Sequence, residues 1–177
     1  MTGGPMDLRS LAREVAFQML YCDDLNPQDM PQHEEVQTQE VVEFARKSLH
    51  ALLHEDPDPA DRPQPHRTCE GGLATADSLQ KWLDSPILIE MTRSLVAGVR
   101  GSRAELDRRL AQAAEHWSIA RMPPTDRNLL RLGAFEIIYA QTPDKAAIDE
   151  AIELAKRFGT ADSPAFVNGI LDRLMNQ

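Results

Sequence analysis

Two histidines, His50 and His54, have the four-residue spacing that places two metal ligands on one face of a helix. A zinc protease with this spacing carries a glutamate, its general base, directly after the first histidine, but here that residue is Ala51. A third ligand would have to come from His66, which lies in a proline-rich segment. We therefore expect two helix-surface histidines and no metal site.

The acidic residues also lack the partners that acid–base chemistry needs. Three acids within residues 149–153 share a predicted helix without a histidine or a defined pocket beside them, so we expect a solvated helix face. Glu136 lies among apolar residues. A buried carboxylate needs a partner, and Arg127 and Arg131 are the candidates on the same helix.

No motif in the sequence indicates covalent or phosphate chemistry. The patterns G-x-x-x-x-G-K-[ST], G-x-S-x-G and C-x-x-C are all absent. Cys22 and Cys69 form no metal-binding or disulfide pattern. We expect no catalytic residue, no metal and no cofactor, and hence a protein that is not an enzyme.

The formal net charge of -9 is distributed unevenly. Residues 22–92 carry 15 acids and 5 bases, whereas residues 93–131 carry 8 arginines and 4 acids. The basic stretch leaves room for a local nucleic-acid site in an acidic protein, and the acidic half suits a basic protein partner. The start of the chain lacks a signal-peptide pattern and no run of 18 apolar residues occurs, so a cytoplasmic location is expected.

Apolar residues recur at three- and four-residue steps along most of the chain, which predicts an all-α protein of about seven helices. The expected helices are 7–22, 34–54, 86–100, 103–117, 126–140, 144–158 and 164–175, with a short one around 76–83. Four prolines between residues 55 and 72 predict a long, flexible insertion there, because each proline lacks a backbone donor.

Several residues indicate where helices begin and end. Gly101 is expected to end one helix, while Thr125 and Thr142 are expected to cap the starts of two others. The pair Ser163-Pro164 predicts the start of the last helix. Gly169 lies inside that helix, where its missing side chain would allow close packing on a neighbour.

Two stretches carry a resemblance to a known family. They are "AREVAFQMLY", residues 12–21, and "DRNLLRLGAFEIIYAQTPDKAAIDEAIELAKRFGTADSPAFVNGILDRL", residues 126–174. Together they resemble the NusB family of all-helical bacterial transcription antitermination factors. The resemblance implies a single domain over 1–177, built as two packed three-helix bundles. Its N-terminal subdomain would be 1–84 with the insertion, and its C-terminal subdomain 85–177.

The resemblance also implies a function without catalysis. Members bind the boxA element of ribosomal RNA leader transcripts together with a small-subunit ribosomal protein, called NusE in this role. The pair joins the RNA polymerase antitermination complex and prevents premature termination. A non-catalytic scaffold for ribosome assembly or rRNA maturation is the alternative. Some members form homodimers, and the sequence leaves the oligomeric state open.

Carried over to this sequence, the family's RNA-contacting first helix falls on Arg9, Arg13, Gln18 and Tyr21. On an ideal helix Arg9 and Arg13 are about 40° apart and Tyr21 lies about 80° further round. One broad face would then offer two phosphate-binding cations and a ring for base stacking. We expect an RNA and partner complex that Arg13→Ala weakens.

This helix departs from the family's arginine-rich pattern. Ser10 and Leu11 stand where further cations are expected, which predicts weaker intrinsic RNA binding and more reliance on the protein partner. Near the C-terminus, Phe166 matches a family position close to RNA. Asp162 matches one at the junction of RNA and the partner, and its acidic side chain also suits a helix N-terminus.

Overall fold

The computed structural model describes residues 8–26, 36–54, 81–115, 117–140 and 142–176, with the backbone alone over 49–54. All regular structure in these ranges is helical, which confirms the all-α prediction. The elements are α1 (Leu8–Leu25), α2 (Thr38–His54), α4 (Pro86–Ala113), the 3₁₀ turn η1 (Ile119–Arg121), α5 (Pro124–Ile138), α6 (Asp144–Phe158) and α7 (Ser163–Met175). Residues 81–83 form one further helical turn before α4.

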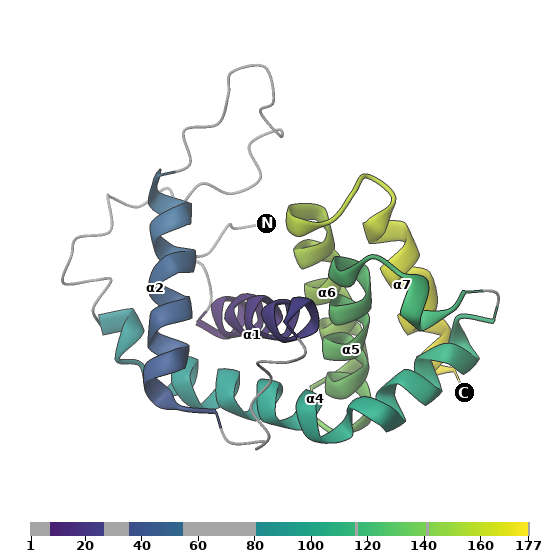
Figure 1. Cartoon of the computed structure of the whole chain (residues 1–177), viewed down its shortest axis with the longest axis horizontal. Helices are drawn as coiled ribbons and strands as arrows, with labels where there is room; N and C mark the ends of the chain where they lie inside the picture. The colour runs from purple at the N-terminus through teal and green to yellow at the C-terminus, as the bar shows by residue number, and fades with distance from the viewer. Residues whose placement is uncertain (1–7, 27–35, 55–80, 116, 141, 177) are drawn as a thin grey trace.

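Helix α4 connects the two halves of the molecule. Its 28 residues span about 42 Å, and it contacts α1 and α2 as well as α5 and α7 (Figure 1). The predicted break at Gly101 is wrong, because the helix continues without interruption. A glycine costs a helix only about 1 kcal/mol. The buried positions Val96, Val99, Leu106 and Leu110 stay in phase across Gly101, so packing on both sides holds the helix together.

Helix α1 lies at the centre of the fold, across α4 and between α2 and α6 (Figure 1). Its apolar side is completely buried, with Leu11, Val15 and Met19 each at most 1% exposed. Unusually, two charged residues of the same helix, Arg13 and Glu14, are buried as well. A buried charge requires a partner, so this helix carries polar contacts into the interior.

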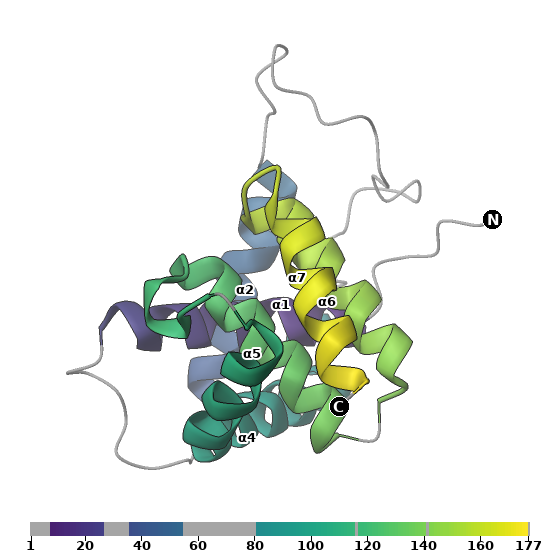
Figure 2. The same cartoon turned by 90° about the vertical axis from the view of Figure 1, so that its right-hand side faces the viewer.

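Helices α5, α6 and α7 follow one another in the chain and pack together, with α6 beside α7 in both views (Figures 1 and 2). Gly133 of α5 permits the close contact with α7, since a Cβ there would lie 2.7 Å from Leu171 Cδ1. Gly169 plays no such part. A Cβ at Gly169 would meet nothing within 4 Å, so the expected close packing at that position is wrong.

The predicted threonine caps are also wrong. Helix α5 starts at Pro124 and α6 at Asp144, and the N-cap positions are prolines 123 and 143. Proline suits both starts because its fixed φ favours the helix and its missing N–H would have no helical partner there. The Thr142 hydroxyl donates instead to Glu136 Oε1 at 3.1 Å. The start at Ser163-Pro164 is confirmed, since α7 begins at Ser163.

Several predictions concern residues outside the described parts. The 55–72 insertion, His66 and the side chains of His50 and His54 are among them. No group of three or more potential metal-ligating side chains occurs among the residues that are described. Within the same residues, no helix is long and apolar enough to cross a membrane. The division into subdomains at residue 84 stays a prediction, and α1 packs on α5 as well as on α2.

Candidate nucleic-acid interface

Side chains of α1 and α6 meet along a line of contacts that we call the α1–α6 seam. At its start the Ser10 hydroxyl donates to Glu150 Oε1 at 2.9 Å. Further along, the Arg157 guanidinium donates to the Glu14 carboxylate. At its end Phe17 packs on the ring of Phe158, with centroids 5.2 Å apart. The predicted RNA-contacting residues of α1 all lie on or beside this seam.

Arg13 is held inside the protein beneath the seam. Its Nε lies 3.0 and 3.1 Å from the two carboxylate oxygens of Glu136, and its Nη2 donates to Oε1 at 2.9 Å. Arg13 is 6% exposed and Glu136 1%. This pair corrects the expectation that Arg127 or Arg131 binds Glu136. On an ideal helix those arginines lie about 180° and 140° away from Glu136, on the other side of α5.

A recess of about 380 Å³ opens between α1, α4 and the start of α6. It is lined by Arg9, Arg13, Met91, Thr142, Pro143, Ala146 and Glu150. Arg9 is exposed at the recess, whereas Arg13 reaches it from the interior. The volume falls within the range of about 300–1,000 Å³ typical of ligand pockets, and two guanidinium groups line it. Guanidinium groups are suitable donors for phosphate oxygens, so the recess is a candidate phosphate site, although the carboxylate of Glu150 also lines it.

Gln18 and Tyr21 have different surroundings. The Gln18 side chain accepts a hydrogen bond from Ser48 Oγ of α2 at 2.8 Å and its amide lies 3.4 Å from Glu14 Oε1. Gln18 therefore links α1 to α2. Tyr21 is half-buried and packs on Phe17, with ring centroids 6.1 Å apart. Its partly exposed ring remains accessible for stacking.

The seam includes two residues that the sequence did not single out. The Arg157 guanidinium lies over the Phe158 ring, 5.0 Å from its centroid. Arg157 is exposed, so a cation and a partly exposed ring stand next to each other at the end of α6. Such pairs are common in single-stranded nucleic-acid sites. The signal was present in "AKRFG", a cation followed by a ring in the family-like stretch.

Phe166 and Asp162 belong to a second surface, on α7, which packs on α4, α5 and α6. The half-buried Phe166 meets Trp117 edge-on, with centroids 5.5 Å apart, and Trp117 is 62% exposed. Asp162 is exposed at the N-cap position of α7, where its side chain makes no capping hydrogen bond. Trp117 was not predicted as a site residue, although an exposed tryptophan is a common binding residue.

Behind the end of α1, one carboxylate binds three arginines. Asp24, whose side chain is 4% exposed, pairs with Arg103 at 2.7 Å, with Arg131 at 3.1 Å and with Arg127. Burial raises the pKa of a carboxyl group, but the hydrogen bonds and charges of Arg127 and Arg131 outweigh it and lower the pKa of Asp24. Arg127 also donates to the carbonyls of Ile119, Ala120 and Met122, so the cluster holds η1 against α1.

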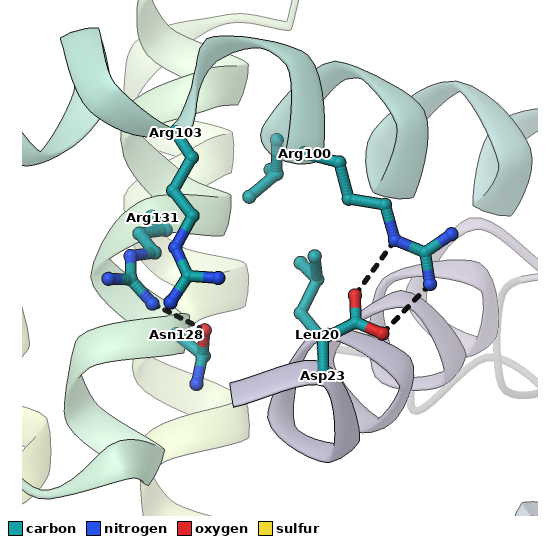
Figure 3. A pocket seen from close by; sticks show the side chains of 7 residues that line it. Leu20, Asp23, Arg100, Arg103, Asn128 and Arg131 are labelled. Carbon is teal, nitrogen blue, oxygen red and sulfur yellow. Dashed lines mark hydrogen bonds and ion pairs between the residues drawn. The ribbon is translucent and has the colours of Figure 1, made fainter. Parts of the chain in front are cut away.

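The same region neutralises the basic stretch that the sequence suggested as a nucleic-acid site. Figure 3 shows Asp23 facing Arg100, whose Nε and Nη2 donate at 2.8 and 2.9 Å. Arg131 also pairs with Asp107 at 2.7 Å. These arginines are therefore paired with acids from the end of α1 and from α4, and their charges are neutralised within the protein. The recess at the start of the seam is the better candidate for a phosphate.

Comparison with known proteins supports this assignment of the fold. The family model that matches is "NusB family", over residues 84–176. The transcription antitermination protein NusB of Trichlorobacter lovleyi is 43% identical over 170 residues, which cover 96% of this chain and 91% of that protein. Some other curated NusB proteins align over about half of this chain, and the aligned part spans only 62–67% of their own length.

Solved structures give the same result. T. maritima NusB has a TM-score of 0.63 and 26% identity, with 99% of this chain and 94% of that chain covered. A complex of the antitermination factors NusB and NusE with dsRNA has a TM-score of 0.60 and 21% identity, with 97% and 98% covered, and shares the fold. Because a relative matches nearly the whole chain and the family model matches its C-terminal half, this chain belongs to the NusB family.

Proposed function

We propose that this protein is an RNA-binding transcription antitermination factor. It binds boxA of ribosomal RNA leader transcripts together with the small-subunit ribosomal protein NusE, and acts in the RNA polymerase antitermination complex. The observation that carries the proposal is the 43% identity to an antitermination protein over 96% of the chain. The common fold with a NusB that is bound to NusE and dsRNA supports it.

The α1–α6 seam offers the chemistry that RNA binding requires. Exposed Arg9 would bind a phosphate at the recess, with Arg13 behind it, and Tyr21 would stack on a base. Gln18 would contact RNA from the same helix, next to the link to α2 that it makes through Ser48.

On α7, Phe166 would extend the RNA surface and Asp162 would contact the basic protein partner. Phe166 lies in the first turn of this helix, beside exposed Trp117, and Asp162 lies directly before that turn. We also infer a non-catalytic role, and a cytoplasmic location, since bacterial transcription takes place there.

The test is formation of a complex between the protein, NusE and boxA RNA, measured by gel shift and fluorescence anisotropy. Arg9→Ala should weaken RNA binding about tenfold, the effect of losing one charge-assisted contact. The matched control is Arg108→Ala, since Arg108 is also exposed but lies on α4 and does not line the recess. Arg13→Ala is a poorer test, because it leaves Glu136 buried without its cation, which costs about 3–5 kcal/mol of stability.

Absence of any complex at low salt would contradict the proposal. Binding to ribosomal precursor particles, without antitermination in a reporter assay, would instead favour the scaffold role.

A further inference from the structure

Two arginines and one glutamate line the recess, and a second glutamate behind it pairs with one of these arginines. Arg9 and Arg13 bring two positive charges to it, while Glu150 lines the recess and Glu136 pairs with Arg13 from the interior. The four formal charges cancel. A surface that attracts phosphate usually carries an excess of positive charge, so the presence of Glu150 requires an explanation.

Glu150 is fixed beside the outer side of Arg13. Arg13 uses Nε and Nη2 to bind Glu136, and its third nitrogen, Nη1, lies 3.9 Å from Glu150 Oε2. The other oxygen of Glu150 accepts the hydrogen bond from Ser10 at 2.9 Å. The Glu150 side chain is 31% exposed, against 8% for Arg13. Glu150 is thus the more accessible member of the pair, on the solvent side.

We propose that Glu150 is an internal competitor of RNA: its carboxylate occupies the position next to Arg13 that an RNA phosphate takes when it binds. Two carboxylate oxygens resemble two non-bridging phosphate oxygens, and both kinds of oxygen accept hydrogen bonds from guanidinium and hydroxyl groups. A phosphate that displaces Glu150 gains both the Ser10 hydroxyl and the Arg13 guanidinium. The inference rests on the proposed RNA-binding function.

This arrangement has two measurable consequences. Glu150 holds RNA affinity down, because an incoming phosphate meets a like charge in the recess. Removing that charge should tighten binding about tenfold, the effect of one unit charge about 6 Å away in a partly exposed site. In wild type the displaced Glu150 carboxylate takes up a cation from solution, which offsets the cation that the bound phosphate releases, and Glu150→Gln removes this offset. The slope of log K against log salt should therefore steepen by about 0.7 for single-stranded RNA.

The experiment compares wild type, Glu150→Gln and Asp149→Asn. Glutamine keeps the length of Glu150 and can still accept the Ser10 hydrogen bond, while it removes the negative charge. Asp149 is the neighbouring acid on α6; it is exposed and does not line the recess, so Asp149→Asn matches the change in net charge. Affinity for labelled boxA RNA is measured over a salt series with NusE present, and thermal unfolding checks that each variant folds.

The inference is supported if Glu150→Gln binds about tenfold tighter with the steeper slope, while Asp149→Asn stays within about twofold of wild type. Equal gains for both variants would show a general charge effect and overturn it, as would no gain for Glu150→Gln. Whichever result the two variants give, binding of boxA RNA by wild type leaves the proposed function in place. If no form binds RNA, the proposed function fails and this inference fails with it.

Discussion

The carboxylate of Asp24 pairs with three guanidinium groups, those of Arg103, Arg127 and the buried Arg131. Asp24→Asn would keep the shape but leave those cations without their counter-charge. We expect it to lower the free energy of unfolding by about 3–5 kcal/mol, the usual effect of breaking a buried pair. Urea unfolding measures the change. Glu43→Gln, at an exposed acid that pairs with Lys47, should change stability by less than about 0.5 kcal/mol.

The same residue predicts a pH dependence. Because the pKa of Asp24 is lowered in the folded protein, its contribution to stability is complete above the pKa of the unfolded chain. That contribution is lost as the pH falls through the lower, folded pKa. Wild type should therefore lose stability on acidification below about pH 4. Asp24→Asn should lack this part of the loss. The free energy of unfolding is measured against pH for both proteins, and parallel plots would contradict the lowered pKa of Asp24.

At the scale of the elements, two helical glycines with opposite surroundings provide a matched pair. A Cβ at Gly98 of α4 would lie 2.0 Å from the Phe135 ring of α5, whereas one at Gly169 of α7 would meet nothing within 4 Å. Gly98→Ala should destabilise the protein by about 1–3 kcal/mol through overpacking. Gly169→Ala should stabilise it by about 0.5–1 kcal/mol, because alanine favours the helix. Thermal unfolding measures both, and shifts of the same sign would contradict the packing of α4 on α5.

At the scale of the whole molecule, the net charge is -9 and many arginines pair with acids inside the protein. Both features should weaken the binding of RNA when the protein acts without a partner. The protein by itself neutralises few phosphates, so its affinity for boxA RNA should be low and its salt slope shallow. Adding NusE, a basic protein, should raise the affinity and steepen the slope, because the partner supplies further cations. Anisotropy titrations at several salt concentrations measure both slopes. Equal slopes with and without NusE would contradict the expectation that the partner supplies the further cations.

Most helices followed from the sequence because their signals are local. Apolar residues at helical spacing located α1, α2 and α5–α7, and the family-like stretch at 126–174 identified the fold. The errors arose where distant packing outweighed a local preference. Gly101 is a weak helix former, yet buried residues on both sides keep α4 continuous. A threonine is a favourable N-cap residue, but the Thr142 hydroxyl donates to the buried carboxylate of Glu136 instead.

The sequence by itself therefore determined the fold class, the family and the helix on which the seam is built. Only the tertiary structure decided which charges remain available to a ligand. Arg13 is 123 residues away from Glu136, and Asp24 is 107 away from Arg131. Charges that look independent in the sequence cancel once folding buries them together, because a buried ion must find an opposite charge. The phosphate binding that we propose for α1 thus depends on Glu136 and Glu150, two carboxylates that other helices supply.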